Sequence, residues 1–181
     1  MSNSFYTPEE LRDLGFKSIG RDVLISRFAR FYGAANMVLG NNVRIDDFCL
    51  LSGEITLGNH IHISAYCALY GGGGIEIGDY SGLSPRCSLF SATDDFSGDY
   101  LIGPQNQKEH TRVIQGKIIL NRFCQLGANT VVLPRVEFGE GSVTGAMSLV
   151  NKSTAPWSIY AGSPARYIKD RNNKLLNFID E

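Results

Sequence analysis

The chain has 181 residues, 43% of them hydrophobic, which suffices to bury one core and gives no reason to divide it into several domains. Its 17 basic and 18 acidic side chains give a formal charge of -1, so charge does not favour binding to nucleic acid or to an anionic membrane. No apolar stretch approaches the roughly 20 residues of a membrane-spanning helix, and the N-terminus lacks the features of a signal peptide. We therefore expect a cytoplasmic protein without membrane insertion.

Residues 1–18 predict a short helical cap. Thr7 is a favourable N-cap, Pro8 suits the first turn, and Glu10 stands three residues after Thr7, where it can complete a capping box. Gly15 is the expected stop signal. This helix is expected to cover one end of the domain.

Residues 19–165 carry a repeat of six residues. Units of this length indicate short strands joined by turns, three to a triangular coil, with each coil paired to its neighbours. The segment therefore predicts an all-β fold, a parallel β-helix. The first positions of successive units, expected to point inward, are Leu39, Ile45, Leu51, Leu57, Ile63, Leu69, Ile77, Leu83, Leu89, Leu120, Leu126, Val132, Phe138, Thr144 and Val150.

The fifth position of each unit is expected to hold a small buried residue, because three corners converge on a narrow interior. Cys49, Cys67, Cys87 and Cys124 all occupy it. The first three follow one another by one coil and should stack on one face. None of the cysteines has Cys-x-x-Cys spacing, so we interpret them as packing residues rather than as metal ligands, redox groups or disulfides.

The hexapeptide frame is lost over about residues 91–117. A gap of this length inside a compact domain is usually functional, so we expect an excursion loop that forms part of a binding site. Its first residues, Ser91-Ala-Thr-Asp-Asp-Phe-Ser-Gly-Asp-Tyr, supply aromatic and hydroxyl groups suited to a sugar. The alternative is an ordinary surface loop with Asx turns.

The last segment, residues 166–181, predicts an amphipathic helix that closes the second end of the domain. Its apolar residues are Leu175, Leu176, Phe178 and Ile179.

Two stretches near the end of the chain are more specific to one family than the six-residue repeats are. They are Gly145-Ala-Met-Ser-Leu-Val-Asn-Lys and Ala161-Gly-Ser-Pro-Ala-Arg-Tyr-Ile-Lys. With the repeats, they make the chain resemble the hexapeptide-repeat acetyltransferases, which include the galactoside and maltose enzymes. The resemblance implies a left-handed β-helix and a homotrimer with active sites at subunit interfaces. It also implies that acetyl-CoA lies between the final coils of adjacent chains, and that the excursion loop reaches over the neighbouring subunit.

The same resemblance assigns residues to acetyl-CoA. Small side chains let the pantetheine arm approach the coil backbone, polar ones lie near the adenosine, and basic ones meet the phosphates, because guanidinium and ammonium groups bind such anions well. A backbone N–H near Ala128 is expected to stabilise the oxyanion. The residues are, in that order, Ala128 and Ala146, Asn151 and Lys152, and Arg166 and Lys169.

Galactoside-type relatives have a catalytic histidine where this chain has Asp94 or Asp95. A sugar hydroxyl needs such a base, whereas an amine has a useful neutral fraction near pH 7 and can attack unaided. We therefore expect N-acylation of an amino sugar, with Asp94 or Asp95 orienting the amine. The phrases Asn-Asn-Val-Arg-Ile-Asp-Asp-Phe and Asp-Asp-Phe-Ser-Gly also resemble the subgroup that acetylates nucleotide-linked amino sugars, such as dTDP-4-amino-4,6-dideoxyglucose, for O-antigen synthesis.

Two alternatives stay open. A sugar O-acetyltransferase would use His62 or His110 as its base. Histidines at the turn position of His60 and the outward-facing position of His62 are, however, more often structural or solvated. A non-catalytic or metal-dependent trimeric β-helix is the other alternative. A metal site of that kind needs three converging histidines, and the spacing of His60, His62 and His110 argues against it, so we expect no metal.

Overall fold

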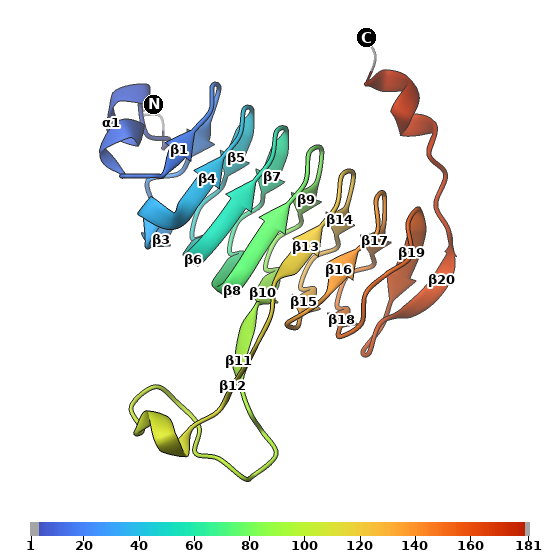
Figure 1. Cartoon of the computed structure of the whole chain (residues 1–181). Coiled ribbons are helices and arrows are strands. Elements are labelled where there is room, and N and C mark those ends of the chain that lie inside the picture. The colour runs from blue at the N-terminus through green and yellow to red at the C-terminus, as the bar shows by residue number, and fades with distance from the viewer. Residues whose placement is uncertain (1–3, 180–181) are drawn as a thin grey trace.

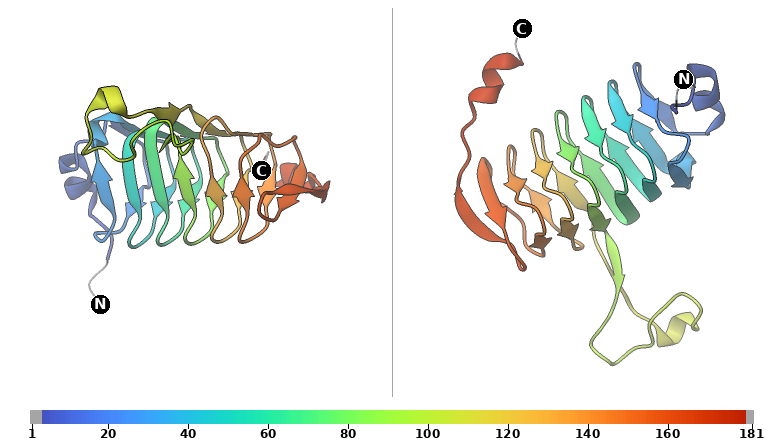
Figure 2. Two further views of the ribbon diagram at one scale, coloured as in Figure 1. Left: turned by 90° about the horizontal axis from the view of Figure 1, so that it is seen from below. Right: turned by 180° about the vertical axis from the view of Figure 1, so that it is seen from behind.

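The computed structural model describes residues 4–179 and shows a left-handed parallel β-helix (Figure 1). Its coils lie side by side along one axis, with the N-terminal and C-terminal segments at opposite ends (Figure 2). The predicted fold class is thereby confirmed. No helix in the described part of the chain is long and apolar enough to cross a membrane.

Successive coils pair through strands of the same face. Leu51 of β6 (Leu50–Leu57) pairs with Leu69 of β8 (Ala68–Ile77) in parallel register, and Leu57 pairs with Ile77 of the same two strands. The register shifts between Gly53 and Ile55, which is where the two extra residues of the longer coil are accommodated. The insertion therefore changes one corner and leaves the pairing on either side intact.

The larger sheet contains β1 (Ser18–Ile19), β3 (Arg30–Tyr32), β4 (Met37–Leu39), β6 (Leu50–Leu57), β8 (Ala68–Ile77), β10 (Ser88–Phe90), β13 (Ile118–Leu120), β15 (Val131–Val132), β16 (Glu137–Phe138) and β18 (Leu149–Val150). The second sheet runs in the order β2 (Leu24–Ile25), β5 (Val43–Ile45), β7 (Ile61–Ile63), β9 (Gly82–Leu83), β14 (Gln125–Leu126), β17 (Val143–Thr144), β19 (Ser158–Ala161) and β20 (Arg166–Asp170). Short 3-10 turns occur at Ala34–Asn36 and Lys108–His110.

The predicted first positions form the core. Ile45, Leu51, Ile63, Leu69 and Phe138 are all fully buried. The fifth-position cysteines are buried as well, and Leu50 N donates to Cys67 O while Ala68 N donates to Cys87 O, so Cys49, Cys67 and Cys87 follow one another in adjacent coils as expected.

The fourth position of many units has a left-handed backbone, which most side chains avoid. Since coils repeat at the strand spacing, aromatic rings at this position stack on one another. His60 lies 4.6 Å from Tyr80 between ring centroids, with the planes only 4° apart, and Tyr80 lies 5.4 Å from Phe123. His60 is thus part of a stacked column at a corner, in agreement with its expected structural role.

The N-terminal cap is a helix, α1 (Pro8–Asp13), with the predicted capping box between Thr7 and Glu10. Both carboxylate oxygens of Glu10 accept hydrogen bonds from Arg27 at 2.7 Å, which tie the helix to the first coil. These bonds, with one from the Thr7 backbone, lower the pKa of Glu10 to about 2.

The helix predicted for residues 166–181 is wrong for most of its length. Arg166–Asp170 forms strand β20, which pairs antiparallel with β19, and only a 3-10 turn follows at Lys174–Phe178. The last coil leaves the edge of β19 without a following coil, and β20 covers that edge by pairing with its backbone. The second end is therefore closed by a strand.

Candidate active site

One corner of the β-helix carries a row of residues that come directly after β5, β7, β9, β14 and β17. Backbone bonds from Ser64 N to Leu83 O (3.0 Å) and from Ser84 N to Leu126 O (2.9 Å) keep successive members of the row in adjacent coils. The row changes from polar to small along the axis. Its members are Asp46, Ser64, Ser84, Gly127 and Gly145.

Ala128 and Ala146 lie next to the small end of this row. Met147 N donates to Ala128 O at 2.8 Å, so the two alanines occupy adjacent coils. Within residues 4–179, neither the Ala128 N–H nor the Ala146 N–H donates a hydrogen bond to another group, although Gly127 N and Gly145 N both do. Small side chains beside available N–H groups suit an extended amide-containing ligand that approaches the backbone closely.

The C-terminal end brings together three of the residues predicted to bind the nucleotide part of acetyl-CoA. Asn151, Lys152 and Arg166 line one cavity of about 360 Å³, with Tyr160 and Tyr167. Lys169 does not line it and lies on β20, paired with Ile159. Arg166 is the first residue of β20 (Arg166–Asp170) and therefore does not cap a final helix.

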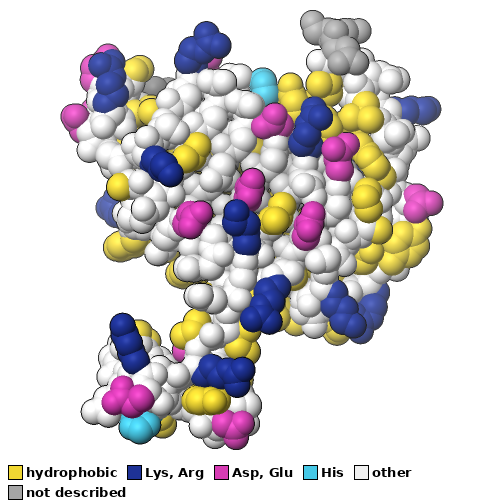
Figure 3. Space-filling model, viewed as in Figure 1, with side chains coloured by type: hydrophobic (Ala, Val, Ile, Leu, Met, Phe, Trp, Pro, Cys, Tyr) yellow, Lys and Arg dark blue, Asp and Glu magenta, His cyan; other side chains and the backbone are white. Residues whose placement is uncertain are grey.

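The excursion is an arm that projects from the body on a two-stranded hairpin, β11 (Ala92–Asp94) and β12 (Val113–Gln115) (Figures 1 and 3). Ser91 is fully buried at its base. The Ser91 hydroxyl accepts from Gly73 N at 2.9 Å and donates to Tyr70 O at 2.8 Å. The base of the arm is therefore fixed to the coils.

Asp94 and Asp95 lie at the end of β11 but have different surroundings. Asp95 is 8% exposed, accepts from Ser97 N at 2.8 Å and lies 3.6 Å from Arg112 Nε. The hydrogen bonds from Ser97, with the nearby Arg112, lower the pKa of Asp95. The half-buried Asp94 carboxylate accepts no hydrogen bond from the described residues. Asp95 holds the loop together, whereas Asp94 keeps its oxygens available.

His110 lies on the outer part of the arm and is not joined to the coil corner within this chain. It belongs to the 3-10 turn Lys108–His110. It lines a cavity of about 500 Å³ formed only by arm residues, including Tyr100 and Glu109.

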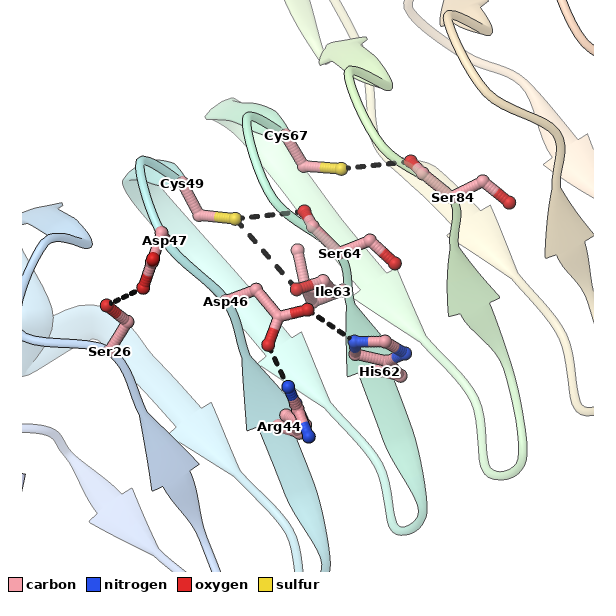
Figure 4. Close-up of polar contacts among 10 residues, drawn as sticks. All are labelled: Ser26, Arg44, Asp46, Asp47, Cys49, His62, Ile63, Ser64, Cys67 and Ser84. Atoms are coloured by element: carbon pink, nitrogen blue, oxygen red, sulfur yellow. Dashed lines mark hydrogen bonds and ion pairs between the residues drawn. The ribbon is translucent and has the colours of Figure 1, made fainter. Parts of the chain in front are cut away.

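His62 lies on the outer face of β7, close to the polar end of the row (Figure 4). Its Nε2 lies 2.7 Å from Oδ2 of Asp46, while Arg44 Nε donates to Oδ1 of the same carboxylate at 2.7 Å. Burial raises the pKa of Asp46, but the hydrogen bonds from Arg44 and His62 outweigh it and hold the pKa below its usual value. His62 is therefore oriented by a carboxylate, as a catalytic or binding histidine would be.

Ser84 is a functional candidate that the sequence analysis missed. It stands in the row between Ser64 and Gly127, next to the predicted acyl-CoA path, and its Oγ accepts a hydrogen bond from Gln125 Nε2 at 3.2 Å. The sequence did contain a signal for Ser84. This serine occupies the second position of its unit, and the strand of that unit pairs with the strand of the unit that carries Gly127.

The cysteines take part in the core and not in this site. The thiol of Cys49 donates to Ser64 O at 3.1 Å and that of Cys67 to Ser84 O at 3.2 Å (Figure 4). Over residues 4–179 there is no group of three or more His, Cys, Asp or Glu side chains that could hold a metal ion.

No family model matches the chain. The dTDP-4-amino-4,6-dideoxy-D-glucose acyltransferase of Escherichia coli is 39% identical over 170 residues, which cover 92% of this chain and 88% of that protein. The colanic acid biosynthesis acetyltransferase WcaF of Escherichia coli K12, itself described as putative, is 28% identical over 145 residues, which cover 78% of this chain and 72% of that protein.

Solved structures agree with this result. AntD, an N-acyltransferase from Bacillus cereus, superposes with a TM-score of 0.97 at 46% identity, covering 99% of this chain and 97% of that one; this structure is the S84C variant with dTDP-4-amino-4,6-dideoxyglucose and coenzyme A. AntD with dTDP and 3-hydroxybutyryl-CoA is equally similar in fold at 47% identity, covering 99% and 96% of the two chains. AntD has also been solved as the D94N variant with dTDP and coenzyme A. The chain belongs to the hexapeptide-repeat acyltransferases, in the family of the dTDP-4-amino-4,6-dideoxyglucose enzymes, and is a CoA-dependent acyltransferase.

Proposed function

We propose that the protein transfers an acetyl group from acetyl-CoA to the amino group of a nucleotide-linked amino sugar such as dTDP-4-amino-4,6-dideoxyglucose. The observation that carries this proposal is the position of Asp94 at the base of the arm, where its carboxylate has no partner among residues 4–179. The similar AntD structure contains that sugar and coenzyme A. The solved AntD structures include variants of a serine and of an aspartate, S84C and D94N, and the same two residue types are the candidates here.

In the proposed reaction the neutral amine attacks the thioester carbonyl carbon. The carbonyl oxygen becomes an oxyanion, which accepts hydrogen bonds from the Ala128 N–H and the Ser84 hydroxyl. The C–S bond then breaks, and the CoA thiolate leaves and takes up a proton. Asp94 orients the amine and accepts the proton that the new ammonium loses, before passing it to water. The amide product and free CoA account for all atoms.

The cofactor is proposed to lie along Ala128 and Ala146, with its adenosine phosphates in the cavity of Asn151, Lys152 and Arg166. Lys169 is proposed as an outer phosphate contact. Basic side chains at one end and small residues beside available N–H groups along the path match the charge and shape of an acyl-CoA.

We also propose a cytoplasmic homotrimer in which the arm of one chain completes the site of the next, in O-antigen or related polysaccharide biosynthesis. The arm supports this, because it exposes large apolar side chains far from its own coils (Figure 3). A neighbouring chain would bury them. These side chains are Phe96 (72% exposed), Leu101 (53%), Ile102 (53%) and Val113 (54%).

The test is release of free CoA thiol with dTDP-linked amino sugars and with their hydroxyl counterparts, using acetyl-CoA and 3-hydroxybutyryl-CoA in parallel. Selective turnover of amino sugars with acetyl-CoA supports the proposal. Turnover only with the longer acyl group would change the donor and keep the reaction class. Turnover only of hydroxyl acceptors would overturn N-acylation.

The second candidate is a sugar O-acetyltransferase, favoured by the 2.7 Å contact between His62 and Asp46. In that case His62→Ala abolishes turnover of hydroxyl acceptors. If His62→Ala is inactive and His110→Ala keeps its activity, His62 is the base. The reverse result assigns His110.

A further inference from the structure

Gln125 is the outward-facing residue of β14, and its amide is held by two acceptors. Nε2 lies 3.2 Å from Ser84 Oγ and 3.3 Å from Leu126 O. A backbone carbonyl only accepts hydrogen bonds, so the amide atom that faces Leu126 O is the nitrogen, and the same NH₂ group donates its second hydrogen to Ser84. Ser84 Oγ is therefore an acceptor in this pair, and its own hydrogen is free to point elsewhere.

Gly82 provides the space for this arrangement. It pairs in register with Gln125 on the adjacent coil. A Cβ atom at Gly82 would lie 2.6 Å from Gln125 Oε1, so any larger residue requires the Gln125 amide to shift. The neighbouring outward position, His62, pairs with Gly82 from the other side.

The direction of the Ser84 hydroxyl matters because of its place in the row. Ser84 N donates to Leu126 O and Asn129 N donates to Pro85 O at 3.0 Å, so the Ser84 turn lies directly beside the turn that carries Gly127 and Ala128. A hydroxyl that already accepts from Gln125 presents its hydrogen to whatever occupies that corner, next to the available Ala128 N–H. Two donors on neighbouring turns suit an atom that gains negative charge.

We propose that Gln125 is a positioning residue for acyl transfer: by donating to Ser84 Oγ, it fixes the Ser84 hydroxyl as a second hydrogen-bond donor to the thioester oxyanion. The proposal rests on the proposed function above. Gln125 takes no part in bond making or breaking; it sets the orientation of Ser84 before the amine attacks, and Gly82 keeps Gln125 in place.

The experiment compares Gln125→Met and Gln125→Glu in the wild type and in the Ser84→Ala background, by CoA thiol release with a nucleotide-linked amino sugar. Methionine keeps the shape and removes the donor, so kcat falls by about tenfold. Glutamate accepts the hydroxyl hydrogen and turns it away from the substrate, so kcat falls by about 100-fold. The KM for acetyl-CoA changes little in both variants, and thermal unfolding shows that both remain folded.

The Ser84→Ala background is the matched control. There, the same substitutions at Gln125 leave kcat unchanged, because no hydroxyl remains to be oriented. Gly82→Ala reproduces the effect of Gln125→Met in the wild type only. The inference is overturned if Gln125→Met has the kcat of the wild type while Ser84→Ala is slow, or if it slows both backgrounds equally. Absence of turnover by the wild type with every amino sugar would instead overturn the proposed function, and this inference with it.

Discussion

Nε2 of His62 lies 2.7 Å from Oδ2 of Asp46, and the two residues come from adjacent coils that pair through β5 and β7. The hydrogen bonds to Asp46 keep its folded-state pKa below the unfolded value of about 3.9, in spite of burial. Such a group stabilises the fold above the unfolded pKa, and its contribution is lost as the pH falls through the folded pKa.

Asp46→Asn should therefore lower the free energy of unfolding at pH 7 by only about 0.5 kcal/mol, because Arg44 and His62 are half-exposed and solvent screens the interaction. The difference from the wild type should shrink as the pH is lowered below about 4. Urea unfolding at pH 7 and at pH 3 measures both effects. An equal difference at the two pH values would show that the charge of Asp46 is not the cause.

Asp94 and Asp95 are expected to respond differently to the same substitution. Asp94→Asn should reduce kcat for the amino sugar without lowering the melting temperature, because its carboxylate has no partner in the described protein. Asp95→Asn should weaken the arm, because it disturbs the bonds to Ser97 and Arg112. Kinetics combined with hydrogen exchange over residues 92–115 separates the two. Loss of turnover in Asp95→Asn alone, with unchanged exchange, would reverse the assignment.

Arg166 is expected to contribute to cofactor affinity and not to chemistry. Arg166→Gln should raise the KM for acetyl-CoA about tenfold and leave kcat nearly unchanged, since it removes a charge-assisted contact to phosphate. Lys152→Gln should act in the same direction. Lys169→Gln is the comparison and should have a smaller effect, because Lys169, the proposed outer contact, does not line the cavity. An equal effect at Lys169 would place the phosphates along β20.

The four thiols are expected to resist modification in the folded protein. All are buried, burial raises the pKa of Cys124 to about 12, and hydrogen bonding with Cys49 and Cys87 together with burial raises the pKa of Cys67. Ellman's reagent at pH 8 should therefore detect no thiol until the protein is unfolded in urea, and then all four. Rapid reaction of one thiol in the native protein would show that a coil opens locally.

Much of the fold was predictable because the position of a residue in the six-residue unit decides whether its side chain is buried. Leu51, Leu69 and Phe138 are inside because they occupy the first position of a unit, and Cys49 and Cys67 follow from the narrowness of the interior. The capping box of Thr7 and Glu10 was predictable for a similar reason, since it depends on a local sequence.

The C-terminal segment was not predictable in this way. Leu175, Leu176 and Phe178 suggested a helix, but the fate of residues 166–170 was decided by the exposed edge of β19, which no local pattern reveals. The site was only partly predictable for the same reason. Motifs indicated Asp94, Arg166 and the small residues, whereas the pairing of Ser84 with Gln125 depends on two coils that are 41 residues apart in the chain.

The arm leaves the coils after β10, yet Ile118 pairs with Ile75 and Leu120 with Ile77 as though no residues had intervened. Each coil contacts only its immediate neighbours, so the packing of the hydrophobic interior does not depend on the length or the composition of the arm. If the arm contacts the acceptor as proposed, this segment can be exchanged while the coils of the β-helix and the proposed cofactor-binding residues stay unaltered. Different sugar acceptors would then require only a different arm, and the stability of the β-helix would change little.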